Sequence, residues 1–236
     1  MVDTSNMDIV YVVGGSSIKN NFEDLKWSLR SLSNIKFRHL FIFTGKIDWL
    51  KPQYIVKTPD IGSTKHIKVI NKLKKICQSS FISDDFVYMN DDFIFTKPHT
   101  LKKRYRLESI KSVMQGSGVL YNQVLDQSLN TLRNSGFQHN NYELHYPMIF
   151  NRKNLKNVLD IYVRNKNTCY RSIYGNIFVD KEYEPMETDP KAFDEQSFFK
   201  FSDEFGFVST NDNIINSDKI RCFLKDTFPN KSIYEQ

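Results

Sequence analysis

Short apolar segments alternate with amphipathic ones along the first hundred residues. Residues 8–13 form an apolar, β-branched run that ends at Gly14 and Gly15, which predicts a buried strand opening into a loop. Further strands are predicted over residues 39–44, 54–57, 85–89 and 93–95. Apolar residues at helical spacing predict helices over residues 21–32 and 67–77. This alternation is typical of an α/β fold with a mostly parallel sheet flanked by helices.

The second half of the chain has a less regular pattern. Helices are predicted over residues 120–136, 155–163 and 194–201, and a strand or extended segment over 145–150. Beyond Ser209 the chain is polar, and its pattern predicts no element. Neither a repeat nor a low-complexity linker divides the chain. We therefore expect one domain over residues 1–236, in which the first half holds the sheet and the second half completes the site.

Length, hydropathy and cysteine content indicate which broad class of protein this chain belongs to. The 236 residues suffice for one α/β domain with a full core. The mean hydropathy of −0.49 and the lack of a long apolar run argue against a membrane span. Residues 1–7 are polar, unlike a secretory signal. Cys77, Cys169 and Cys222 fit neither zinc spacing nor a disulfide framework. We therefore expect a protein of the reducing cytoplasm with no membrane partner.

The charge balance bears on the partner. The net charge is +6 and the pI is about 9.0, which favours polyanions such as nucleic acid, nucleotides or phosphorylated glycans. A solvated basic surface without a specific partner is an equal alternative. Basic residues cluster over residues 65–68, 72–75 and 102–106, and this clustering favours a polyanion.

The strongest chemical signal is Asn90-Asp91-Asp92, which follows the predicted strand 85–89. Open α/β sheets bind ligands at the carboxyl ends of their strands. Adjacent carboxylates repel each other, so a divalent ion between Asp91, Asp92 and a diphosphate would relieve their charge. A simple turn is the alternative, because Asn and Asp favour turns. The aromatic runs over residues 86–88 and 93–95 favour a site over an exposed turn.

Candidate phosphate contacts lie after the first strand and on two predicted helices. Val13, Gly14 and Gly15 would let backbone N–H groups approach a phosphate, with an ordinary strand-to-helix loop as the more common structure. Arg30, and Lys65 at the start of the next helix, are cations that would hold a diphosphate if they face the strand ends. Solvated helix charges are the more common case for both.

The second half offers three further candidates. His145 lies in an apolar stretch, where a neutral imidazole would serve as a metal ligand or as a base. Asp194 opens the predicted 194–201 helix and is either its cap or the base that activates an acceptor hydroxyl. Arg171 is a weaker candidate anion contact. Structural histidines and capping aspartates are more common, so these residues count only in combination.

Several segments resemble the Stealth proteins, which are hexose-1-phosphate transferases of capsule synthesis. Residues 23–32 (EDLKWSLRSL) resemble the family's "EL-x-x-SLRS-[IL]" helix. Residues 39–45 (HLFIFTG), followed by Trp49-Leu50, resemble its next strand and "WL" sequel. Residues 88–95 (YMNDDFIF) resemble its "Y-x-NDD-x-F-[FI]" segment, and His145-Tyr146-Pro147 resembles its "H-x-P" element. The resemblance covers residues 8–98 and the patch at His145.

The resemblance implies the plan of the glycosyltransferase-A (GT-A) fold, with a donor-binding half over residues 1–100 and an acceptor half over 101–236. It implies that Gly14 and Arg30 face the nucleotide or phosphate of a nucleotide sugar, foremost a UDP-sugar. Asp91 and Asp92 would hold Mn²⁺ or Mg²⁺ and the donor. His145 would be a metal ligand or an acid/base.

The chain departs from the family after the first strand. Residues 12–16 read VVGGS, where Stealth proteins have a tryptophan-valine-aspartate-glycine stretch, so the acidic residue is missing. Transfer of the sugar alone and transfer of sugar-1-phosphate therefore both stay open. The short basic chain also resembles small phage glycosyltransferases, some of which modify hydroxymethylated bases in DNA. Such an acceptor would explain the basic clusters.

We therefore expect a metal-dependent glycosyltransferase that uses a nucleotide sugar and a hydroxymethylated DNA base as acceptor. One alternative is a Stealth-like hexose-1-phosphate transferase that acts on a surface or capsular polysaccharide. An alternative of another class is a non-catalytic nucleic-acid or nucleotide-binding module, which the missing acidic residue favours. A metal-dependent phosphohydrolase or nuclease would need more carboxylate and histidine ligands than the sequence offers.

Overall fold

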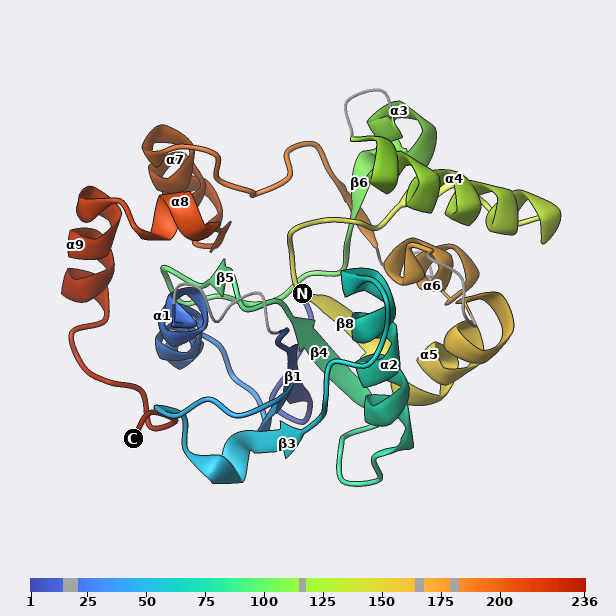
Figure 1. Ribbon diagram of the computed structural model, residues 1–236. Helices are drawn as coiled ribbons and strands as arrows, with labels where there is room; N and C mark the ends of the chain where they lie inside the picture. The colour runs from blue at the N-terminus through green and yellow to red at the C-terminus, as the bar shows by residue number, and fades with distance from the viewer. Residues whose placement is uncertain (15–20, 115–117, 164–167, 179–182) are drawn as a thin grey trace.

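A computed structural model describes residues 1–14, 21–114, 118–163, 168–178 and 183–236 (Figure 1). Its centre is a five-stranded sheet in the order β3-β2-β1-β4-β8. In that order the strands span Ile55–Lys57, Leu40–Thr44, Asp8–Val12, Asp85–Met89 and Met148–Asn151. The first four strands are parallel, and β8 runs antiparallel to β4. The predicted α/β fold with a mostly parallel sheet is therefore confirmed.

The sequence pattern had predicted that the first half of the chain holds the sheet. The structure shows that the sheet also includes a strand from the second half. Strand β8 comes from the second half and pairs with four of the five residues of β4, with Phe86 opposite Phe150. Although β8 is the last strand in the order, its residues Met148, Ile149 and Phe150 are buried. The second half therefore supplies part of the core sheet as well as part of the site.

Side chains of β1 alternate between two cores. Val10 and Val12 face one core, which is covered by α2, α4, α5 and α6, whereas Ile9 and Tyr11 face the other, which contains α1. Figure 1 shows these helices on opposite sides of the sheet. The helices are α1 (Glu23–Ser31), α2 (Lys65–Gln78), α4 (Val119–Asn134), α5 (Arg152–Val158) and α6 (Tyr170–Phe178). A π-helical turn, Leu159–Val163, continues α5.

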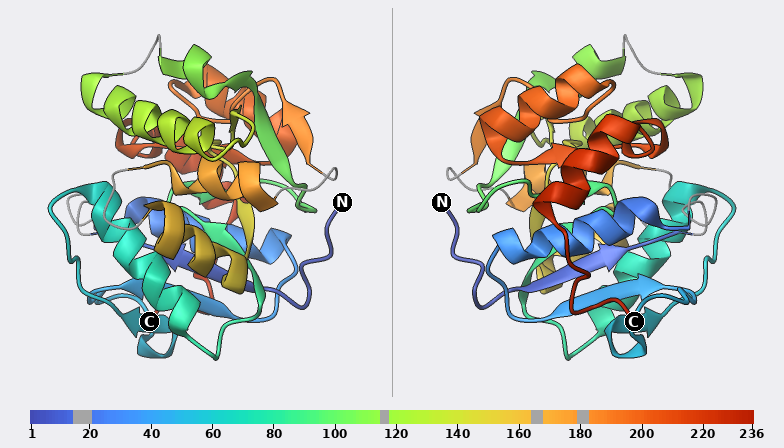
Figure 2. Two further views of the ribbon diagram at one scale, coloured as in Figure 1. Left: turned by 90° about the vertical axis from the view of Figure 1, so that its right-hand side faces the viewer. Right: turned by 90° about the vertical axis from the view of Figure 1, so that its left-hand side faces the viewer.

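A third core joins the end of the chain to α1. Trp27 of α1 and Ile94 pack there with apolar residues of the last three helices. These are α7 (Glu195–Phe205), α8 (Asp212–Ile215) and α9 (Asp218–Thr227), and Figure 2 shows α9 lying beside α1. Strands β5 (Phe93–Ile94) and β10 (Val208–Ser209) form a two-stranded sheet beneath them. The polar tail beyond Ser209 is thus a folded part of the domain.

The remaining elements form a small sheet beside the main one. Strand β6 (Arg104–Ser109) pairs with β7 (Asn140–Asn141) and with β9 (Glu184–Met186), and α3 (Ile110–Met114) follows β6. Two 3-10 turns, Leu32–Asn34 and Pro52–Tyr54, complete the secondary structure of the described residues. Within the described residues, no helix combines the length and apolar character needed to cross a membrane.

Candidate functional site

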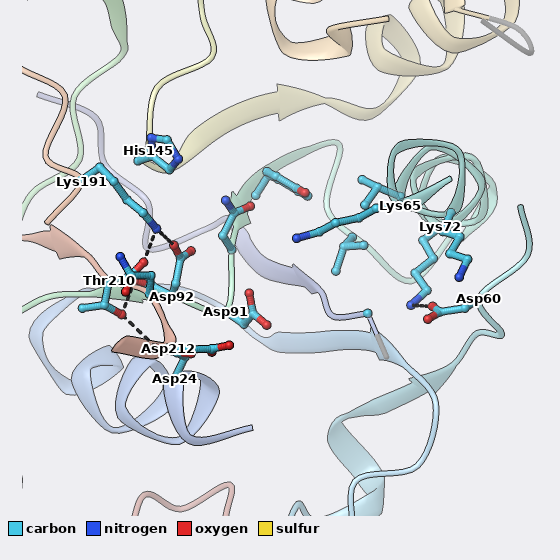
Figure 3. A pocket seen from close by; sticks show the side chains of 17 residues that line it. Asp24, Asp60, Lys65, Lys72, Asp91, Asp92, His145, Lys191, Thr210 and Asp212 are labelled. Carbon is cyan, nitrogen blue, oxygen red and sulfur yellow. Dashed lines mark hydrogen bonds and ion pairs between the residues drawn. The ribbon is translucent and has the colours of Figure 1, made fainter. Parts of the chain in front are cut away.

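A cavity of about 530 Å³ opens at the carboxyl ends of β1 and β4 (Figure 3). Neighbouring parallel strands bring their carboxyl ends to one edge of the sheet, and open α/β sheets bind ligands there. Gly14 lies at the end of β1, and Asn90, Asp91 and Asp92 lie at the end of β4. Buried aromatic strands fix the position of this acidic turn on both sides. The carboxylates therefore lie where the sequence pattern placed them.

Four aspartates form one side of the cavity, which we call the aspartate wall: Asp24, Asp91, Asp92 and Asp212. Asp24 comes from the first turn of α1 and is 7% exposed, and its Oδ1 accepts a hydrogen bond from Thr210 Oγ1 at 3.0 Å. Asp212 opens α8. Figure 3 shows Asp24, Asp91 and Asp212 close to one another on this side. The wall therefore joins residues that are far apart in the sequence.

Lys191 neutralises part of this wall. Its Nζ lies 2.7 Å from Oδ2 of Asp92 and 3.2 Å from Oγ of Ser209, and it also contacts the backbone oxygen of Thr210. Ser209 Oγ donates a second hydrogen bond to Asp92 Oδ2 at 2.8 Å. Both charged side chains are largely buried, and such groups require partners of opposite charge. Asp92 is therefore held in a fixed orientation by the protein itself.

Three lysines of α2 form the opposite side of the cavity, which we call the lysine wall: Lys65, Lys68 and Lys72. Helix α2 begins at Lys65, so its positive dipole end lies at the cavity, and Figure 3 shows Lys65 pointing inward. Lys72 is 1% exposed, and its Nζ donates to Val13 O at 2.6 Å and pairs with Asp60 at 2.5 Å. Asp60 also lines the cavity and offsets the charge of Lys72, so Lys65, Lys68 and the helix N-terminus are the groups that suit an anion.

His145 lines the cavity and is held by Asp189. Asp189 Oδ2 lies 2.8 Å from the imidazole Nδ1, and Asp189 Oδ1 accepts the backbone N–H of His145 at 2.9 Å. Burial opposes ionisation of Asp189, but hydrogen bonds and charge from His145, with the charge of Arg106, hold its pKa below the ordinary value. The carboxylate therefore stays ionised and leaves Nε2 as the other reactive atom of the imidazole.

The predicted three-ligand metal site is not assembled. Among the described residues, no group of three or more histidine, cysteine, aspartate or glutamate side chains is placed to hold a metal ion together. His145 binds Asp189 through Nδ1, and within the described part of the chain its Nε2 is not grouped with the carboxylates of Asp91 and Asp92. Asp91 and Asp92 still offer oxygen ligands on one turn. Mg²⁺ commonly binds through one or two carboxylates plus substrate phosphates, so this pair fits an ion that arrives with a diphosphate.

Arg30 and Asp194 lie away from the cavity. Arg30 points instead to the C-terminal segment, where its guanidinium donates two hydrogen bonds of 2.8 Å to Glu235. Asp194 caps α7, because its side chain accepts the backbone N–H of Ser197 at 2.7 Å in a capping box. The structure thus corrects the placement of Arg30 at the donor site and of Asp194 as the base for the acceptor, and for Asp194 it agrees with the capping alternative.

Of the other candidates, Arg171 contacts Tyr88, which lines the cavity. It is 6% exposed, donates from Nη2 to the backbone oxygen of Tyr146, and lies 5.9 Å from the ring centre of Tyr88. It is not itself a lining residue. Val13 contributes its carbonyl to Lys72, whereas Gly15 falls outside the described residues.

Comparison with known proteins does not identify the function of this chain. No family model matches the sequence, and no curated protein matches it. Among solved structures, the glycosyltransferase GlyE in Streptococcus pneumoniae TIGR4 is similar with a TM-score of 0.38 and 14% sequence identity. The similar region covers 78% of this chain and 46% of that chain, so it spans less than half of that glycosyltransferase. The chemistry of the cavity therefore carries the functional conclusion.

Sequence patterns missed several residues of the cavity. Lys191 and Asp189 are separated from their partners Asp92 and His145 by 99 and 44 positions, and no local pattern predicts such pairs. Asp24 had been interpreted only as a first-turn acid of its helix. The one available signal for Lys68 was its clustering with Lys65, which had been interpreted only as favouring a polyanionic partner. These residues become recognisable only once the fold brings their elements together.

Proposed function

We propose that this protein is a glycosyltransferase that uses a nucleotide-sugar donor. One observation carries the proposal: a single cavity at the carboxyl edge of the sheet has a lysine wall opposite an aspartate wall. A nucleotide sugar combines an anionic diphosphate with a polyhydroxyl group. Ammonium groups and a helix N-terminus suit the diphosphate, and carboxylates accept hydrogen bonds from sugar hydroxyls. A cavity of about 530 Å³ falls within the usual range of small-molecule sites.

In this proposal the lysine wall and Lys191 stabilise the leaving diphosphate. Negative charge grows on the leaving oxygen as its bond to the sugar carbon breaks, and fixed positive groups lower the energy of that state. A Mn²⁺ or Mg²⁺ ion held by Asp91 and Asp92 would supply further positive charge there. Because Lys191 is already paired with Asp92, it is oriented before the donor binds.

The proposed base is His145. An acceptor hydroxyl that attacks the sugar carbon must lose its proton, and the imidazole Nε2 is the nitrogen that Asp189 leaves available. The new bond joins the acceptor oxygen to the sugar, the bond to the diphosphate breaks, and the proton passes to His145. Asp194 does not take this role in the proposal, because it caps α7 outside the cavity.

For the acceptor, we propose the hydroxyl of a hydroxymethylated base in DNA, which the net charge of +6 supports. A surface polysaccharide, receiving sugar or sugar-1-phosphate, is the alternative that the resemblance to Stealth proteins supports. Transfer of radiolabelled sugar to hydroxymethylated duplex DNA or to polysaccharide distinguishes the two acceptors. Binding to DNA that weakens steeply as salt rises would support the first.

Donor turnover tests the proposal. We expect the protein to release nucleoside diphosphate from one of the UDP-, GDP- or ADP-sugars in the presence of Mn²⁺ or Mg²⁺. Replacement Asp92→Asn should lower kcat by about 10²–10³-fold, because it disturbs the charge balance at the leaving group. Asp203→Asn, at an exposed ion pair on α7, is the matched control and should keep full activity. Equal turnover by the Asp92 variant and the wild type would contradict the proposal.

A further inference from the structure

A second cavity, of about 330 Å³, lies on the outer side of α1. Helix α9 and the C-terminal segment border it, and Figures 1 and 2 both show α9 beside α1. Its basic and aromatic lining residues are Lys26, Trp27, Arg30, Trp49, Lys225 and Lys231. Helix α1 therefore presents Asp24 to the first cavity and a different set of residues to this one.

The second cavity carries an excess of positive charge. Four basic residues line it, against the two carboxylates of Glu23 and Glu235. Glu23 pairs with Lys26 at 3.2 Å, and Glu235 accepts both hydrogen bonds of Arg30. The charges of these carboxylates are thus already balanced by two of the cations. The ammonium groups of Lys225 on α9 and of Lys231 provide the excess, and Lys231 Nζ also donates a hydrogen bond to the backbone oxygen of Gln236 at 2.9 Å.

Both tryptophans of the chain line this cavity. The guanidinium of Arg30 lies 4.7 Å from the ring centre of Trp27, and Lys26 Nζ lies 5.4 Å from that of Trp49. Trp27 is 3% exposed, and its Nε1–H is buried without a hydrogen-bond partner among the described residues. A buried N–H without a partner is costly, so a ligand oxygen that reached it would be favoured.

We propose that this cavity binds a phosphate group. A phosphate offers several oxygens, which match the combination of Arg30, the two excess lysines and the indole N–H of Trp27. An uncharged sugar would leave the excess positive charge unmatched, and a cation would be repelled. The proposal is independent of the glycosyltransferase proposal, because none of these residues lines the first cavity. The phosphate belongs either to a small phosphorylated molecule or to a nucleic-acid backbone, and both present the same chemistry.

Tryptophan fluorescence tests this proposal directly, because both of the chain's fluorescent indoles lie at the cavity. The wild type is titrated with inorganic phosphate and, separately, with a short duplex DNA, with sodium chloride at matched ionic strength as the control. We expect a saturable change with phosphate. A tighter response to DNA that weakens as salt rises would assign the phosphate to a nucleic-acid backbone, and a response to phosphate alone would assign it to a small molecule.

Three variants separate specific binding from general charge. The double variant Lys225→Gln/Lys231→Gln should raise the apparent Kd about tenfold, whereas Lys156→Gln, at an exposed ion pair on α5, should leave it unchanged. Trp27→Phe keeps the aromatic packing but removes the N–H, and it should weaken binding measured by calorimetry. Absence of a saturable response to either ligand, or equal affinity in the wild type and the double variant, would overturn the proposal.

Discussion

At the scale of single residues, the first cavity is built from charges that the protein has already paired. Asp92 is held by Lys191 and Ser209, and His145 is held by Asp189. The pair of Lys191 and Asp92 is largely buried, and removal of one of its members leaves the other charge uncompensated, which destabilises the fold. A substitution of one partner in either pair should therefore lower activity, because the remaining partner loses its fixed orientation.

The pair of His145 and Asp189 gives a prediction about catalysis. In Asp189→Asn the side chain loses the charge that orients the imidazole, so we expect kcat to fall about tenfold to a hundredfold with little change in the KM for the donor. Initial rates at saturating donor measure this effect. Glu108→Gln, which removes an exposed partner of Arg106 on the same strand, is the control. A lower donor affinity at unchanged kcat would contradict the proposed role of His145.

At the scale of elements, the cavity depends on where strand β4 ends and where helix α2 begins. Strand β4 delivers Asn90-Asp91-Asp92 to the sheet edge, and the Thr64 cap starts α2 so that Lys65 and Lys68 face the cavity. In the second half, the ring of Tyr142, which follows β7, lies directly against Gly175 of α6.

That contact predicts a large effect of one added methyl group. A Cβ at position 175 would lie 2.4 Å from ring atoms of Tyr142, so Gly175→Ala must push α6 away from the buried tyrosine. We expect a loss of about 1–3 kcal/mol in the free energy of unfolding, measured by urea denaturation. At Gly45 an added Cβ meets nothing within 4 Å, so Gly45→Ala is the control. Equal stability of the Gly175 variant and the wild type would show that the packing is looser than described.

Local patterns predicted most elements of the first half, because there each buried strand is a compact apolar run. Strand β4 was predicted over residues 85–89, as observed. Beyond Ser209 the pattern did not predict helix α9, because this helix buries only Ile220 and Leu224 within a polar sequence. Strand β6 was missed because half of its side chains are charged and none of its residues is buried.

The same limit explains which site residues could be predicted. The acidic turn after β4 was found because two adjacent aspartates follow a buried strand. Lys191 and Asp189 could not be found, because their role depends on a contact across the fold. Arg30 was misplaced because the sequence shows that a helix follows the first strand but not which face of that helix points to the strand ends.

At the scale of the whole molecule, buried ion pairs connect distant segments. Asp8 pairs with Arg38, and Glu235 pairs with Arg30 across 205 positions. Burial raises the pKa of Asp8 and of Glu235, but hydrogen bonds from their arginine partners outweigh it, and both pKa values lie below the ordinary ones. Asp189 behaves in the same way beside His145.

These lowered pKa values predict sensitivity to acid. A carboxyl with a lower pKa in the folded state stabilises the fold fully above its unfolded pKa, which is 3.8 for aspartate and 4.5 for glutamate. That stability is lost as the pH falls through the folded values. We therefore expect the free energy of unfolding in urea to drop as the pH is lowered from 5 to about 3. Asp8→Asn should be less stable at pH 7 and less sensitive to acid. A free energy of unfolding that stays constant over this range would contradict the described pairs.

The central claim is that the cavity between the lysine and aspartate walls binds a nucleotide sugar. The most direct test is the melting temperature of the protein with a panel of nucleoside diphosphates and nucleotide sugars, with and without Mn²⁺ or Mg²⁺. A saturating ligand that binds only the folded state should raise the melting temperature by about 5–10 °C. We predict such a rise for one nucleotide, and a smaller one in the Lys65→Gln/Lys68→Gln variant. No rise with any nucleotide under any ion condition would contradict the claim.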